Sequence, residues 1–445
     1  MNKFSRIGFI LAAAGSAVGL GNIWKFPYVT GEYGGGAFVI VYLLAILFIG
    51  LTVFIAESFL GQTSQSNVAT TFEKVSQSQN PKWKFSGFMV FSGLIILSFY
   101  SVVLGWILNY VIMSFSSLPV DAKEAGENFN NLISNEIGTQ ILLHSIVALI
   151  TVFIVLKGIK EGIEKINLIL MPLLGIILFG LLVYAISLDS FSKSIDFMFT
   201  PNWEKIDSHA LLAALGQAFF TLSLGIGTII TYSASLPKKA NFVKSSIYVA
   251  LVDTSIAIIA GLIIFSFLFE AGASSQAGPG LVFISLPVVF QQWGVLGNII
   301  AVSFFIALVF AGITSAVSMI EPTLMLLVER FKITREKAVI ICGLIFYSFG
   351  IIALLSMSSA YGNTLTFFGK NAFDWMDFIT SSVAMPIAAL ITCIFLGYFV
   401  EKEKIKKIFL KHVPVFIFNI WYILIKYFVP IAILILFLNK LGVIN

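Results

Sequence analysis

The sequence is poor in residues that most enzymes and secreted domains use. Its 445 residues include two cysteines and three histidines, and charged residues make up only 11%. Cys342 and Cys393 both lie in apolar runs, so we expect buried thiols rather than a disulfide framework, a metal cluster or thiol chemistry. Soluble proteins are roughly 25% charged, so the shortage of charge excludes an ordinary soluble domain.

Apolar residues take the place of the missing charge. They make up 58% of the chain, and the mean hydropathy is +0.99. A membrane helix needs about 20 apolar residues, whereas barrel strands alternate over about ten. The long runs therefore predict an all-α integral membrane protein with a single transmembrane domain over residues 1–445. We expect eleven spans, near residues 6–30, 36–63, 84–117, 138–156, 161–187, 209–235, 242–270, 295–329, 337–356, 371–399 and 413–438.

The distribution of Lys and Arg predicts the orientation. With a cytoplasmic N-terminus, 20 of them fall in inner segments and five in outer segments, as the positive-inside rule requires. An odd number of spans then leaves the C-terminus extracytoplasmic, and we expect the cell (inner) membrane. The basic run 402–411 is a topology signal or a lipid contact. The net charge of +5 does not indicate a nucleic-acid partner, because the charges lie in loops between spans.

Glycines interrupt two of the apolar runs at mid-depth. The first reads Gly15-Ser-Ala-Val-Gly-Leu-Gly21-Asn22, and the second reads Phe220-Thr-Leu-Ser-Leu-Gly-Ile-Gly227. Glycine lets a helix open, and open backbone survives in a membrane only where it lines a cavity or is buried in protein. Interrupted helices in both halves of a chain point to a transporter's binding site, although glycines spaced like Gly15 and Gly19 also occur in helix packing.

Three carboxylates and a lysine lie inside predicted spans, where charge is costly and marks functional candidates. Asp253 has no Lys or Arg at its depth in adjacent runs, so a bound cation would compensate its charge. Glu57 is suited to accept hydrogen bonds from N–H groups freed at the breaks. Glu321 and Lys25 are further candidates, and a packed hydrogen bond or a snorkelling side chain is the alternative for each.

Hydroxyl groups gather in the eighth predicted span, in Ala311-Gly-Ile-Thr314-Ser315-Ala-Val-Ser318. Hydroxyls in membrane helices often bond the carbonyl four residues earlier. The alternative is a sodium site, because hard cations prefer oxygen ligands. Adjacent hydroxyls, together with carbonyls of a broken helix, would supply them.

These motifs together resemble the neurotransmitter:sodium symporter family, over residues 6 to about 400. The resemblance rests on Arg6-Ile-Gly-Phe-Ile-Leu-Ala-Ala-Ala-Gly15 through Asn22-Ile-Trp-Lys-Phe-Pro27, on Gly34-Gly-Gly-Ala-Phe38, on Gly216 to Gly227, and on Asp374-Trp-Met-Asp377. It implies the leucine-transporter fold, with broken helices 1 and 6. The two inverted repeats would cover residues 6–187 and 209–399, followed by helix 11 over 413–438.

The resemblance also implies two sodium sites and an amino-acid site. The first sodium site would use Ala17, Asn22, Thr221 and Asp253, together with the substrate carboxylate. The second would use Gly15, Val18, Ala311, Thr314 and Ser315. The substrate carboxylate would meet Leu20, Gly21 and Tyr100, and the ammonium would meet Ala17, Phe220, Thr221 and Ser223. The side chain of the substrate would lie among Ile96, Phe220, Ile226, Ser315, Ser318 and Met319.

Two positions narrow the substrate and the ions. Monoamine-transporting relatives carry an aspartate where this chain has Gly19, so a substrate with its own carboxylate is favoured. The mainly apolar pocket favours a hydrophobic or aromatic amino acid. Chloride-dependent relatives carry Asn where this chain has Asp253, so we expect transport without a chloride requirement.

The gates depart from the family pattern. The outer gate would pair Lys25 with Asp377, and Lys lacks the bidentate fork of Arg. At the inner gate, only Lys3 and Arg6 remain to face Glu329.

The fifth predicted span carries a further motif. Gly162 and Pro172 match a pattern that some members use to unwind helix five, opening a water path to the second sodium. An ordinary proline kink is the alternative.

The leading hypothesis is therefore a sodium-driven amino-acid symporter and not an enzyme. A channel would need a ring of filter residues, and none stands out. An intramembrane enzyme would need a catalytic constellation, and the histidines His144, His209 and His412 form no metal-ligand pair. A receptor that binds without transporting stays open. The role of Lys426 and the oligomeric state are not predicted.

Overall fold

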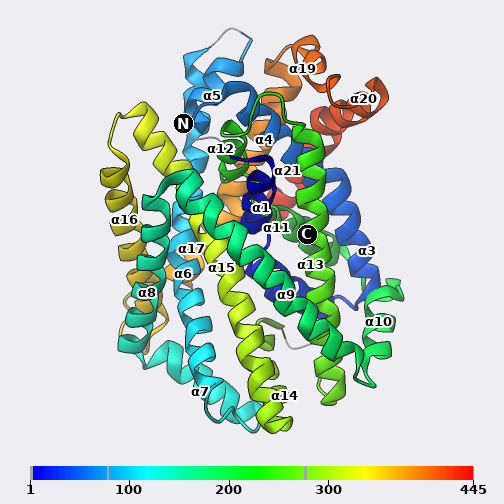
Figure 1. Ribbon diagram of the computed structural model, residues 1–445, viewed down its shortest axis with the longest axis vertical. Coiled ribbons are helices and arrows are strands. Elements are labelled where there is room, and N and C mark those ends of the chain that lie inside the picture. Colours follow the sequence, from blue (N-terminus) through cyan, green and yellow to red (C-terminus); the bar gives the residue numbers. More distant parts are fainter. Residues whose placement is uncertain (1–3, 78–79, 275–277, 444–445) are drawn as a thin grey trace.

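The structure, a computed structural model, describes residues 4–77, 80–274 and 278–443 as a bundle of long helices (Figure 1). Within these residues, nine helical spans are long and apolar enough to cross a membrane, and one bent helix pair makes a tenth if it counts as one span. The helices of the nine spans are α3 (Gly36–Ala45) with α4 (Leu51–Ser64), α6 (Met89–Met113), α8 (Ile137–Leu156), α9 (Lys165–Ile186), α13 (Phe242–Glu270), α15 (Gly294–Arg330), α16 (Arg335–Met357), α17 (Ala372–Asp377) with α18 (Met385–Ile394), and α20 (Val415–Ile423) with α21 (Val429–Lys440).

Several spans contain turns of a wider or tighter helix. Within the nine spans, the π-helical turns are Ile46–Gly50, Ile159–Glu164, Phe378–Ala384, Phe395–Phe399 and Leu424–Phe428, and a 3-10 segment, Pro81–Phe88, leads into α6. Each π-helical turn inserts a residue and is frequent at functional sites. The turn at Ile159–Glu164 contains Gly162 and precedes α9, and Pro172 lies inside α9.

The first predicted span, 6–30, is broken. Helix α1 (Arg6–Ala17) ends in extended backbone at Val18, and a π-helical turn (Gly21–Lys25) leads into α2 (Phe26–Glu32). The two parts meet at an angle of 49°.

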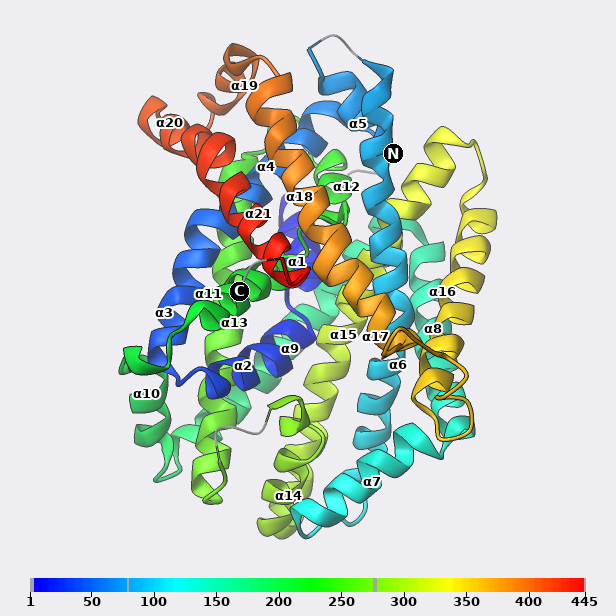
Figure 2. The same cartoon turned by 180° about the vertical axis from the view of Figure 1, so that it is seen from behind.

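The predicted span 209–235 is also two helices, α11 (Ser208–Thr221) and α12 (Thr228–Ala234). The backbone between them takes positive φ at Ser223, Gly225 and Gly227. Glycine adopts that conformation without strain, so Gly225 and Gly227 favour the break, whereas Ser223 adopts it despite its side chain. Both interrupted segments lie in the middle of the bundle (Figures 1 and 2).

Short elements connect the spans at both ends of the bundle. They are the helices α5 (Val68–Val75), α7 (Ala122–Ser134), α10 (Phe191–Phe199), α14 (Ser285–Gln292) and α19 (Lys402–Phe409), the 3-10 turns Trp203–Lys205 and Gly278–Leu281, and an antiparallel pair, β1 (Thr366–Phe367) with β2 (Lys370–Asn371). Helices α5 and α19 lie at one end, and α7, α10 and α14 lie at the other (Figure 1).

The polarity of the bundle is that of a membrane protein. Large apolar side chains are exposed along its outer helices, among them Leu149 and Phe153 on α8 and Phe179 on α9. Buried inside are Glu57, Asp253 and Glu321, each 0% exposed. Apolar surface outside and charge inside reverse the pattern of a soluble protein, as lipid contact requires.

Candidate functional site

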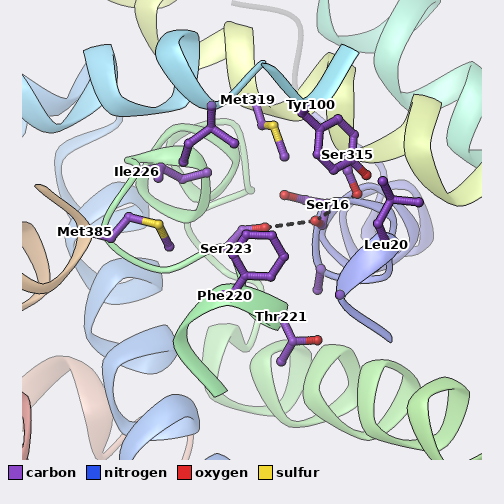
Figure 3. Close-up of a pocket in the computed structure, with 14 residues that line it drawn as sticks. Ser16, Leu20, Tyr100, Phe220, Thr221, Ser223, Ile226, Ser315, Met319 and Met385 are labelled. Atoms are coloured by element: carbon purple, nitrogen blue, oxygen red, sulfur yellow. Dashed lines mark hydrogen bonds between the residues drawn. The ribbon is translucent and has the colours of Figure 1, made fainter. Parts of the chain in front are cut away.

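The two helix breaks touch one another. The Ser223 hydroxyl donates to the carbonyl of Ser16 at 2.8 Å, which joins the second break to the end of α1 (Figure 3). On the far side, the Gly225 N–H donates to Glu57 Oε1 at 2.9 Å. Glu57 thus accepts a hydrogen bond from a backbone N–H that has no partner within a helix. This is the kind of contact that we expect of Glu57 from the sequence.

A buried pocket lies between the breaks (Figure 3). Twelve of the thirteen residues expected at the substrate line it, from Ala17, Gly19, Leu20 and Gly21 through Ile96, Tyr100, Phe220, Thr221, Ser223, Ile226 and Ser315 to Met319. Ser318 lies behind the lining, where its hydroxyl donates to the Ser315 carbonyl and bonds Ser16 Oγ. The free space inside it is small, about 20 Å³, which is little more than one water molecule needs.

Sequence reasoning missed two lining residues, Ser16 and Met385. Ser16 stands among the quoted glycine-break residues, so its position in the motif was a usable signal. Met385 begins α18, and its carbonyl approaches the second break so closely that a Cβ on Gly225 would lie 2.4 Å from it. Only the three-dimensional packing of α18 reveals this contact.

Gly19 faces the polar end of the pocket. A Cβ placed there would lie 2.6 Å from Ser315 Oγ and 3.2 Å from the Tyr100 hydroxyl oxygen. The Tyr100 hydroxyl is buried and has no hydrogen-bond partner among the described residues. A buried hydroxyl without a partner costs free energy, so this group is available to a ligand.

Three of the residues expected at the first sodium form one cluster beside the pocket. The Asn22 amide donates to Asp253 Oδ1 at 2.7 Å, and the Thr221 hydroxyl donates to the same oxygen at 2.9 Å. Ala17 lines the pocket next to them. Asp253 forms no ion pair with Lys or Arg among the described residues. Two neutral donors do not cancel a buried charge, so the cluster is suited to a cation.

The residues expected at the second sodium also converge. The Ser315 hydroxyl lies 3.2 Å from the carbonyl oxygen of Gly15 and 3.3 Å from that of Val18, across the gap between α15 and α1. The Thr314 hydroxyl bonds the carbonyls of Phe310 and Ala311 on its own helix, as hydroxyls of membrane helices often do. Carbonyl oxygens at the first break and a hydroxyl group of α15 thus lie side by side.

The outer gate residues line a second cavity, which shares Leu20, Tyr100 and Phe220 with the pocket. Lys25 and Asp377 both face this cavity, but no ion pair within 4.0 Å joins them in the described part of the chain. The Lys25 ammonium lies over the Phe220 ring instead, 4.6 Å from its centroid.

In the described part of the chain, Glu329 of the proposed inner gate contacts Asn67. Glu329 accepts from the N–H and the side-chain amide of Asn67. Arg6 is exposed, and Lys3 lies outside the described residues. A contact that sequence reasoning missed joins Ser5, whose N–H and hydroxyl both donate to Glu164, to the turn before α9.

The buried carboxylate of Glu321 has a partner that was not expected. Arg335, at the start of α16, donates to both of its oxygens at 2.9 and 2.7 Å. This bidentate pair satisfies Glu321 structurally. Arg335 lies outside the apolar runs, so its contact with a span was not visible in the sequence.

An all-helical membrane bundle with a buried pocket between two interrupted helices has the architecture of a secondary transporter. The sequence profile described as the sodium:neurotransmitter symporter family matches residues 2–136 and 132–445. The chain belongs to this family. It is therefore a sodium-dependent symporter of the neurotransmitter and amino-acid class, and not an enzyme.

Two relatives cover nearly the whole chain, and a third covers most of it. YhdH of Bacillus subtilis (strain 168), described as an uncharacterized sodium-dependent transporter, is 34% identical over 99% of this chain and 98% of its own length. An uncharacterized sodium-dependent transporter of Haemophilus influenzae is 33% identical over 98% of this chain and 97% of its own. The sodium-dependent nutrient amino acid transporter 1 of Drosophila melanogaster is 25% identical over 82% of this chain and 68% of its own.

A solved structure resembles the whole fold. It is the crystal structure of MhsT in complex with L-phenylalanine, which is 39% identical, has a TM-score of 0.88, and covers 99% of this chain and 100% of its own.

Proposed function

We propose that this protein imports a hydrophobic or aromatic amino acid together with sodium by alternating access. The observation that carries the proposal is Asp253, a fully buried carboxylate bonded by neutral donors beside a pocket between two broken helices. A sodium ion there would supply the missing positive charge. The similar structure of MhsT holds L-phenylalanine, which supports an amino acid as the substrate.

The two breaks suit the two charges of an amino acid. The positive end of a helix begins at Gly21 and the negative end of another lies at Thr221, both on the pocket wall. The substrate carboxylate would bind at Leu20, Gly21 and Tyr100, and the ammonium at the carbonyls of α11.

The coupling of substrate and sodium would follow from one group that both use, the substrate carboxylate. If the substrate carboxylate also ligates the first sodium, substrate and ion each raise the affinity of the other by the same factor. The second sodium would occupy the oxygens of Gly15, Val18, Ala311, Thr314 and Ser315. The fixed charge of Asp253 supports transport without a chloride requirement.

We propose the remaining family features on the same basis. The chain would cross the cell membrane eleven times, counting α11 and α12 as one interrupted span. Residues 6–187 and 209–399 would form inverted repeats, with 413–438 as the eleventh helix. The N-terminus would be cytoplasmic and the C-terminus extracytoplasmic.

A binding screen tests the proposal. Each of the twenty amino acids is added to the purified protein, in sodium chloride and in choline chloride, and binding is measured by calorimetry. We expect binding of hydrophobic or aromatic amino acids in sodium alone. Binding that ignores sodium for all twenty would refute the proposal.

A further inference from the structure

Asn167, on α9, is a buried amide next to the proposed second sodium site, and neither the sequence motifs nor the family match assigns it a role. Its side chain is 0% exposed. The Nδ2 group donates to the Ile163 carbonyl at 2.8 Å, one turn earlier in the same chain. The Oδ1 atom has no hydrogen-bond partner among the described residues. Because the bond to Ile163 requires a donor, it fixes which end of the amide is the free oxygen.

The free oxygen of Asn167 lies against Gly15, near the end of α1. A Cβ placed on Gly15 would lie 1.9 Å from Asn167 Oδ1 and 3.1 Å from Thr314 Cβ. Asn167 Oδ1 therefore lies against the Gly15 backbone, on the side where α1, α9 and α15 meet. Gly15 supplies a carbonyl to the proposed site, and Thr314 and Ser315 supply its hydroxyls.

A buried amide oxygen without a donor is costly. A cation relieves that cost, since carbonyl-type oxygens are the ligands that hard cations prefer. Building on the proposed function, we infer that Asn167 supplies a further oxygen to the second sodium ion, from α9. The ion is then held by three helices rather than two.

The anchor of this oxygen links the ion to the winding of α9. The bond from Asn167 to Ile163 exists because the chain is helical between the π-helical turn Ile159–Glu164 and Asn167. Unwinding of this stretch breaks the bond and withdraws the oxygen from the ion. Sodium binding and a wound α9 therefore stabilise one another, and release of the ion accompanies unwinding.

The test uses sodium itself as the probe, so it does not depend on knowing the substrate. The thermal unfolding midpoint of the full-length protein in detergent is measured against sodium chloride, with choline chloride keeping the ionic strength constant. A ligand that binds the folded state raises this midpoint. Asn167→Leu removes the oxygen at similar size, and we expect it to raise the half-maximal sodium concentration about tenfold, the lower end of what loss of a supporting group at a metal site costs.

Matched variants separate ion binding from folding. Asn167→Asp keeps an oxygen and should leave sodium dependence intact or strengthen it. Gln140→Leu removes another buried amide, one that bonds Trp106 and the Ile133 carbonyl. It should lower the midpoint at every salt concentration without moving the sodium dependence. If Asn167→Leu does not fold, Asn167→Ser, which retains a shorter oxygen, should show a smaller shift in the same direction.

The experiment distinguishes failure of the Asn167 inference from failure of the proposed function. If Thr314→Val shifts the sodium dependence and the Asn167 variants do not, the inference is overturned and the proposed function stands. If sodium does not stabilise the unsubstituted protein at all, both are overturned.

Discussion

The proposed ion and substrate binding depends most on two residues, on the carboxyl group of Asp253 and on the missing side chain of Gly19. The carboxyl group of Asp253 is fully buried in a cluster with Asn22 and Thr221. Gly19 leaves open a position that a Cβ would fill. Asp253 stood out in the sequence because a charge inside a span is costly, and Gly19 stood out because monoamine-transporting relatives carry an aspartate at its position. Asn167 did not stand out, since an asparagine can bond its own helix, and only its free oxygen makes it unusual.

The charge of Asp253 predicts the anion requirement. In the unsubstituted protein, sodium-driven uptake should persist when gluconate replaces chloride, because the carboxylate already balances the cation. Asp253→Ser removes that charge, so uptake should need more sodium and should become dependent on chloride. Uptake in proteoliposomes is measured for the unsubstituted protein and for Asp253→Ser, each in chloride and in gluconate. Loss of uptake by the unsubstituted protein in gluconate would contradict the prediction.

Gly19 predicts a steric limit on the pocket. In Gly19→Ala, the added Cβ would lie 2.6 Å from Ser315 Oγ, and amino-acid affinity should fall by about tenfold, or 1.4 kcal/mol. Gly216→Ala on α11 is the control, since a Cβ there meets nothing within 4 Å. Equal affinities of the two variants in calorimetry would argue against the assigned substrate position.

The membrane-spanning helices were predictable from the sequence wherever the length of an apolar run determines them. The predicted spans other than 209–235 each match a helical span or the bent pair α1 and α2. The site was predictable where it coincides with the breaks, because open backbone needs glycine. Contacts made by packing were not: Met385 reaches the pocket from α18, and Arg335 reaches Glu321 from beyond the membrane run. The π-helical turns shift the register of helix faces, and no residue type marks them in the sequence.

Helix α9 predicts a kinetic effect. Pro172 has no N–H, so one helical hydrogen bond is missing, and Pro172→Ala restores it and favours the wound state. Sodium-driven uptake should slow several-fold, with equilibrium sodium binding changed by less than about twofold. Stopped-flow and equilibrium titrations measure the two quantities.

Gly175→Ala is the control on the same helix, because a Cβ there meets open space. Gly162→Ala is a poor test, since its Cβ would lie 2.1 Å from the Ile154 carbonyl oxygen and would disturb the wound helix itself. Unchanged uptake rates in Pro172→Ala would show that unwinding of α9 does not limit transport.

The whole molecule has an apolar exterior and buries the carboxyl groups of Glu57, Asp253 and Glu321 in its interior. The end with α5 and α19 carries the basic run 402–411, and the opposite end carries α7, α10 and α14 (Figures 1 and 2). The sequence predicts that the end with the basic run faces the cytoplasm, because Lys and Arg are enriched on that side of a membrane protein.

The orientation can be tested with single cysteines. Cys342 and Cys393 are buried, so the parent chain should resist a membrane-impermeant maleimide. In intact cells, Lys193→Cys on α10 should react and Lys407→Cys on α19 should react only after permeabilisation, since both side chains are exposed. The opposite labelling pattern would invert the proposed topology.

Uptake by purified protein in sealed proteoliposomes tests the central claim most directly. An amino acid that binds in sodium is added outside, with an inward sodium gradient and an inside-negative potential, which contributes about 2.3 kcal/mol per charge per 100 mV. We expect the amino acid to accumulate above its external concentration, and to leave again when the sodium gradient is collapsed. Sodium-dependent binding without accumulation would identify a receptor. Entry of the amino acid only down its own gradient would identify a channel. Either result would contradict sodium-coupled symport.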